Sequence, residues 1–171
     1  MIGNFIRQKM AGYLRQAEVY GSMRRMWMES AFWTREAVCL PTKSESLERA
    51  LTVPQVISGF FGDYYSDATV KQIEIALTGH MRAVINSAED LKAHGERIIR
   101  VMTNANSHLN EGELRDHVEK FTRLSASWVA SHKGGQTKAG IAAFDTLVDA
   151  ATGLADYLST NLIAQFNERF K

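Results

Sequence analysis

The residues in this sequence whose types and spacing could do chemistry are two histidines and two aspartates. His80 and His117 each fall among apolar residues that recur every three or four positions, which is the spacing of a helix face. Asp145 and Asp156 lie on a stripe that borders the apolar face of the last expected helix. Two imidazoles and a carboxylate bind iron and related divalent metals, and helical bundles hold such sites in their cores. The four residues therefore predict a divalent metal site for iron, zinc or manganese, and oxidative chemistry is the activity that such a site could support.

The same four residues have a structural interpretation. A histidine on an apolar face is more often a core residue whose ring makes a satisfied hydrogen bond. A stripe of aspartates is more often a solvated helix face. On this interpretation the chain holds no cofactor, and the metal site is the alternative.

Sequence motifs of known enzymes are missing. The chain has no phosphate-binding Walker loop, no Cys-x-x-Cys, no His-Glu-x-x-His, no Gly-x-Ser-x-Gly and no Glu-x-x-His. The single cysteine, Cys39, reads as a small buried hydrophobe, because no basic neighbour in the sequence stands ready to lower its pKa. We therefore expect a protein that is not an enzyme.

Length and charge narrow the class of protein. The 171 residues favour one domain, and a net charge of +1 does not suggest a protein that binds nucleic acid. The longest run without a charged residue covers residues 50–62 and is interrupted by Pro54, whereas a spanning helix needs about 20 apolar residues. A lone thiol and the lack of a signal-peptide core indicate a cytoplasmic protein.

Helical periodicity dominates the chain and no alternating strand pattern is convincing. We expect an all-α fold, an antiparallel bundle of about four long helices with short accessory helices and an extra N-terminal amphipathic helix. Capping boxes are expected at Thr42 and Asn110, and Asp67 is expected to cap a long helix. The expected helices cover residues 2–20, 22–40, 42–51, 54–62, 67–91, 96–103, 110–132 and 137–170. The last carries the clearest apolar stripe, from Ile141 to Phe166.

The N-terminal segment differs in charge from the rest. Residues 1–25 carry five basic residues (Arg7, Lys9, Arg15, Arg24 and Arg25) and one acidic residue, Glu18, for a net +4, which leaves −3 for the remainder. We divide the chain into an extension over residues 1–22 and a bundle over residues 23–171. A basic amphipathic helix binds a second copy, another protein or a membrane surface, or it packs on its own bundle. We favour a non-enzymatic scaffold or interaction protein that forms homo-oligomers through this helix.

Residues 26–35 read Met-Trp-Met-Glu-Ser-Ala-Phe-Trp-Thr-Arg. This segment resembles Leu-Trp-x-x-His-x-x-Trp-Thr-Arg, the opening signature of an uncharacterised family of short helical proteins from bacteria and giant viruses. Further similarities follow in order at residues 64–66, 77–80, 105–106 and 117, and then at Phe144-Asp145, Asp156, Leu158-Ser159, Ile163 and Gln165-Phe166. The resemblance covers residues 23–170 and implies an all-α bundle but no reaction.

The chain also departs from that family. Ser30 stands where the signature has its first histidine, and polar positions near Gly79, Gly140 and Ala150 look replaced. If the family's polar residues form a metal site, this chain has lost at least one ligand. We also expect Ser30 to occupy a polar niche in the core, because it lies between Trp27 and Thr34 on an apolar face.

Overall fold

The described residues form six α-helices and two short 3-10 helices. The structure is a computed structural model that describes residues 2–40, 44–87 and 90–171. The helices, in order, are α1 (Ile2–Cys39), α2 (Ser44–Phe60), η1 (Phe61–Asp63), α3 (Asp67–Asn86), α4 (Leu91–Ala105), α5 (Glu111–Lys133), α6 (Thr137–Gln165) and η2 (Asn167–Phe170). The described ranges contain no strand, so the prediction of an all-α fold is confirmed. Within the same ranges, no helix is long and apolar enough to cross a membrane.

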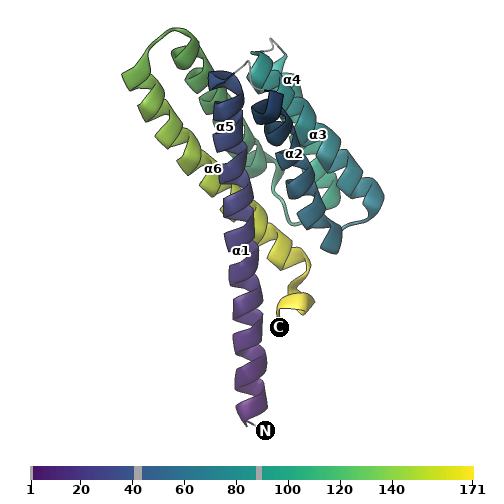
Figure 1. The fold of residues 1–171 in the computed structure, drawn as a ribbon. Helices are drawn as coiled ribbons and strands as arrows, with labels where there is room; N and C mark the ends of the chain where they lie inside the picture. Colours follow the sequence, from purple (N-terminus) through teal and green to yellow (C-terminus); the bar gives the residue numbers. More distant parts are fainter. Residues whose placement is uncertain (1, 41–43, 88–89) are drawn as a thin grey trace.

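Each helix packs against the next one along the chain, and α6 returns to pack against α1 (Figure 1). The core draws on all six helices, with fully buried side chains that include Met23, Ile57, Ile73, Ile99, Leu114 and Leu154. Only the C-terminal half of α1 is surrounded by other helices. Its N-terminal half extends beyond them, and the C-terminal η2 lies against its middle (Figure 1).

The predicted break between residues 20 and 22 does not exist, because α1 is one helix of 38 residues. A glycine inside a helix costs about 1 kcal/mol relative to alanine, which a long helix tolerates when packing holds it. Residues on both sides of Gly21 in the sequence make contacts with α6. The Tyr20 hydroxyl lies 2.8 Å from the Thr160 hydroxyl, and Arg24 donates to Asp156. The predicted N-terminal extension and the first helix of the bundle therefore form one continuous α-helix.

Residues 44–60 also form one helix where two were expected, and Pro54 lies inside it. Proline removes one backbone hydrogen bond. Val53, Pro54 and Ile57 are all buried, so the packing of this turn offsets that loss. The capping box expected at Thr42 lies outside the described residues.

The break between α3 and α4 lies earlier in the sequence than the predicted break at Gly95. Ser66, rather than Asp67, caps α3, because its hydroxyl accepts a hydrogen bond from the Thr69 amide. The helix ends at Asn86, and the following residue, Ser87, adopts a left-handed conformation with φ 55°. Gly95, the predicted break, lies inside α4 and is buried where α4 meets α5. A small residue suits this contact, because a side chain there would touch Thr122 and Val118.

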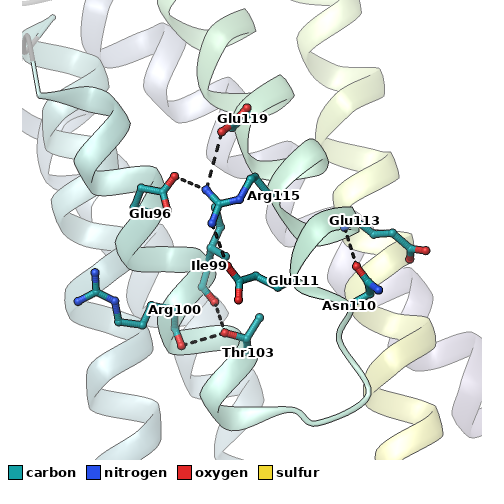
Figure 2. A network of polar contacts seen from close by, with 9 residues as sticks. All are labelled: Glu96, Ile99, Arg100, Thr103, Asn110, Glu111, Glu113, Arg115 and Glu119. Carbon is teal, nitrogen blue, oxygen red and sulfur yellow. Dashed lines mark hydrogen bonds and ion pairs between the residues drawn. The ribbon is translucent and has the colours of Figure 1, made fainter.

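The N-cap of α5 and most of the apolar stripe of α6 were predicted correctly. The Asn110 side chain accepts a hydrogen bond of 3.1 Å from the Glu113 amide (Figure 2). The α6 stripe is buried at Phe144, Ala151, Ala155, Leu158 and Leu162. Ile141 is an exception because it is 61% exposed, and the helix ends at Gln165 rather than at residue 170.

A polar network joins α4 to α5. Arg115 donates to Glu96 on α4 and to Glu111 one turn earlier on α5, the latter at 3.0 Å (Figure 2). Glu119 completes the group with an oxygen 3.9 Å from the same guanidinium. The contact with Glu96 joins α4 to α5, whereas Glu111 and Glu119 lie on α5 itself and surround the same guanidinium.

Candidate functional site

His80 points into the core, as its spacing predicted. Its side chain is 5% exposed, and burial lowers its pKa from 6.5 to about 4, with a smaller contribution from His94. The Nε2 atom shares a hydrogen bond of 2.8 Å with the Thr122 hydroxyl of α5, and the ring stacks on Phe121. At neutral pH the imidazole is therefore uncharged and fixed between α3 and α5.

A small polar cavity lies beside His80. It leaves about 20 Å³ of space, which suits one water molecule. Ser30 lines it and is 7% exposed, so the expected polar niche at Ser30 is present. The other polar groups that line it come from Trp27, Thr34 and Ser125. The Trp27 Nε1 atom is buried and has no hydrogen-bond partner among the described residues, so a donor is available beside this cavity.

His117 lies in a different environment. It is half-buried at the contact between α5 and α6, and its ring stacks on Tyr157 with centroids 4.9 Å apart. Its imidazole also lies over Gly153, where an added Cβ would touch the ring at 3.9 Å. The Tyr157 hydroxyl in turn donates to the Asn110 carbonyl and accepts from the Asn110 amide. This stack therefore orders the start of α5.

The two aspartates, Asp145 and Asp156, lie in different parts of the structure. Asp156 accepts two hydrogen bonds from Arg24, of 2.6 Å and 2.8 Å, and so ties α6 to α1. Asp145 is exposed and lines a cleft at the opposite end of α6. Across the described ranges, no three His, Cys, Asp or Glu side chains are grouped so that they could hold a metal ion. The structure thus assigns His80, His117 and Asp156 separate hydrogen-bonding or stacking partners and does not bring the four predicted ligands together.

The cleft beside Asp145 contains a pair that the sequence did not reveal. The Cys39 sulfur lies 3.8 Å from Nδ1 of His132, and the His132 ring stacks on Trp128. Arg35, one turn before Cys39, lines the same cleft of about 650 Å³. The expectation that Cys39 lacks a basic neighbour is therefore wrong. Arg35 could have been found from its i−4 spacing, but the pairing with His132 spans 93 residues and has no local signal.

The most unusual surface is on the N-terminal half of α1. Met10, Tyr13 and Leu14 are 59%, 60% and 63% exposed, and Ala17, on the same helix face, is also exposed. These four residues, together with the exposed Gly21, are called the α1 stripe below. The other exposed large apolar side chains of the described residues are Phe32, Leu47, Val56, Ile75 and Ile141. They are distributed over four helices, so the α1 stripe is the place where such residues are adjacent.

The opposite side of α1 is covered by the end of the chain. The Arg15 guanidinium donates to the carbonyl oxygens of Arg169 and Lys171, at 2.9 Å and 2.7 Å. Gly12 lies so close to η2 that an added Cβ would be 2.3 Å from the Phe170 oxygen. The C-terminus therefore supports the extended half of α1 and leaves the stripe uncovered.

Comparison with known proteins adds no assignment. No protein-family model matches the chain, and neither the curated proteins nor the solved structures give a match. The argument for function therefore depends on the surfaces and contacts described above.

Proposed function

We propose that this protein is a non-enzymatic interaction protein that self-associates through the N-terminal half of α1. The observation that carries the proposal is the α1 stripe, where three large apolar side chains are about 60% exposed on adjacent turns. A row of this kind is stabilised when a partner removes it from water. The finer architecture that we propose with it is an antiparallel bundle whose long helices are α1, α3, α5 and α6.

The stripe is held away from its own bundle. Arg15 is bound to the C-terminal carbonyls, Tyr20 to Thr160 and Arg24 to Asp156, so α1 is bonded to the C-terminus and to α6 at three successive levels. These contacts fix the direction in which α1 leaves the bundle (Figure 1). Because α1 is one continuous helix, the stripe cannot fold back without breaking it. A partner outside the chain is the remaining way to cover the stripe.

A second copy is the partner that the chain itself supplies. Every molecule carries the same stripe, and closed pairs of identical patches are the commonest arrangement of oligomers. A standard interface buries about 800 Å² on each partner, and two or three helical turns offer less. The association is therefore expected to depend on concentration in the range reached during purification.

The test compares two charge substitutions at equally exposed apolar positions. Leu14→Glu places a charge in the α1 stripe, and Ile141→Glu places one on α6, where Ile141 is 61% exposed. Sedimentation equilibrium over a hundredfold range of concentration should show self-association of the unchanged chain and of Ile141→Glu. Leu14→Glu should remain a monomer. A natural chain that is monomeric at every concentration would overturn the proposal.

Two other partners are separate outcomes of this test. If the natural chain is monomeric, flotation with vesicles that contain anionic lipid shows whether Lys9 and the stripe bind a membrane surface. If it neither self-associates nor binds vesicles, a different protein becomes the expected partner. In both cases Leu14→Glu should weaken the interaction, because the stripe is the shared surface.

A further inference from the structure

The cleft that contains Cys39 lies at the end of the bundle where α1 ends and where α5 is followed by α6 (Figure 1). Its volume of about 650 Å³ is within the range of sites that bind small molecules, about 300–1,000 Å³. Cys39 is partly exposed and lines the cleft, so a molecule in the cleft can reach its side chain.

A thiol and a base are paired inside this cleft. The Cys39 sulfur lies 3.8 Å from Nδ1 of His132, and the two residues belong to the last turns of α1 and α5. The His132 ring is stacked on Trp128 with 17° between the ring planes, which orients the imidazole. In the tautomer that carries its hydrogen on Nε2, Nδ1 accepts the proton of the thiol. This is the arrangement of a nucleophile and its general base.

Two opposite charges lie in the same cleft. The Arg35 guanidinium is 5.0 Å from the centroid of the Phe144 ring, which holds it in the wall of the cleft one turn before Cys39. Asp145 is exposed and also lines the cleft. A guanidinium binds carboxylates through paired N–H donors, and a carboxylate binds ammonium groups. The cleft therefore suits a small molecule that carries both a carboxylate and an amino group.

We infer that Cys39 undergoes thiol–disulfide exchange with a small disulfide that carries amino and carboxylate groups, as oxidised glutathione does. Nδ1 of His132 takes the proton of the Cys39 thiol, and the sulfur attacks one sulfur of the disulfide. The S–S bond of the small molecule breaks as the new S–S bond forms, and the leaving thiolate takes the proton from His132. Cys39 is thereby oxidised, and the released half of the disulfide is reduced to a thiol.

The product is a lasting modification of the chain. Cys39 is the single cysteine of the 171 residues, so no second thiol among them can displace the bound group. The mixed disulfide therefore remains until an external thiol reduces it. This activity is separate from the proposed self-association, because the cleft is at the other end of α1 from the stripe.

Exchange rates measured by intact-protein mass spectrometry test the inference. The natural chain is incubated at neutral pH with oxidised glutathione or with hydroxyethyl disulfide, which carries neither amino nor carboxylate groups. The same chain unfolded in urea keeps the thiol and loses the cleft, so it reports the intrinsic rate. We expect folding to speed the reaction with oxidised glutathione about tenfold and the reaction with hydroxyethyl disulfide about threefold.

Two substitutions separate the contributions of the base and of the charge. His132→Gln removes the base and should slow the reactions with both disulfides about threefold. Arg35→Gln removes the partner of the carboxylate and should slow the reaction with oxidised glutathione alone, again about threefold. Arg100→Gln is the matched control, because it removes the same charge from an exposed position on α4, outside the cleft, and should change neither rate.

Three results would contradict the inference. A folded chain that reacts no faster than the unfolded one would show that Cys39 is not a site of exchange. Equal acceleration with both disulfides would overturn the assigned class of ligand. A folded His132→Gln chain that reacts as fast as the natural chain would remove His132 from the reaction. The comparison of the folded with the unfolded natural chain needs no substitution, so a variant that fails to fold does not prevent the decision.

Discussion

His80 and Thr122 are joined inside the core by a hydrogen bond of 2.8 Å between Nε2 and Oγ1, which links α3 to α5. His80 is buried, so its ring is shielded from bulk water. We expect Thr122→Val to leave Nε2 unpaired and to lower the free energy of unfolding by about 1–3 kcal/mol. Thr122→Ser keeps the hydroxyl and should cost only about 0.8 kcal/mol for the lost methyl group. Urea unfolding measures both, and equal losses would show that the hydrogen bond contributes little.

The same histidine should make stability depend on pH. Burial lowers the pKa of His80 to about 4, whereas in the unfolded chain it is near 6.5. Between these values the unfolded chain binds a proton that the folded chain does not. The stability contributed by neutral His80 is therefore fully present above pH 6.5 and is lost as the pH falls toward 4. The total loss is about 3 kcal/mol.

His80→Gln is the control for this pH dependence, because glutamine can form hydrogen bonds but does not titrate. Carboxylates titrate in the same range in both chains, so the difference between the two curves reports His80 alone. Urea unfolding at several pH values from 4 to 7 should give a steeper curve for the natural chain. Parallel curves would mean that His80 is protonated as easily in the folded chain as in the unfolded one.

Local patterns in the sequence determined much of the fold. The helix faces that contain His80 and Ser30 were visible because apolar residues recur at helical spacing, and both residues are buried. The cap at Asn110 was visible because a capping box needs only four consecutive residues. The prediction of a break near Gly21 was wrong. Contacts of α1 with α6 stabilise that turn of the helix, and contacts between distant residues cannot be predicted from local sequence.

Contacts between distant residues could not be predicted in the same way. Periodicity places a residue on a face but does not say what that face meets. Asp156 looked available for a metal, but it is bound by Arg24, 132 residues earlier. The Cys39–His132 pair was missed for the same reason. The α1 stripe was recognised as amphipathic, but only the structure shows that the bundle leaves it exposed.

The cavity beside Ser30 allows a test of core packing. Its free space of about 20 Å³ holds a water molecule but not an imidazole. We therefore expect Ser30→His to overfill the core and to lower the free energy of unfolding by about 1–3 kcal/mol. Ser30→Ala is the control and should cost less, because it enlarges the cavity by a single oxygen atom. Thermal unfolding compares them, and an unchanged midpoint for Ser30→His would show that the core opens to accept the ring.

Metal analysis tests the alternative that the chain binds iron, zinc or manganese. His80 is bonded to Thr122, His117 is stacked on Tyr157 and Asp156 is held by Arg24. We therefore expect protein purified from metal-supplemented medium to contain well below one metal ion per chain by elemental analysis. One equivalent of metal that disappears in both His80→Ala and His117→Ala would establish the metal site instead.

The contact of Gly12 with the C-terminus gives the last prediction. A Cβ at Gly12 would lie 2.3 Å from the Phe170 oxygen, well inside the distance at which atoms repel. Gly12→Ala must therefore displace η2 and weaken the bonds from Arg15 to the Arg169 and Lys171 carbonyls. We expect a loss of about 1–3 kcal/mol in the free energy of unfolding and faster amide hydrogen exchange in residues 167–171.

Two control variants distinguish the effect of this clash from the general preference of an α-helix for alanine over glycine. Gly59→Ala is the matched substitution inside α2, where an added Cβ meets nothing within 4 Å, and it should stabilise the chain by about 1 kcal/mol. In a chain that ends at Phe166 the Phe170 oxygen is gone, so the effect of Gly12→Ala should change sign from destabilising to stabilising. If the substitution destabilises the shortened chain as much as the full one, the contact between Gly12 and η2 does not anchor the C-terminus to α1.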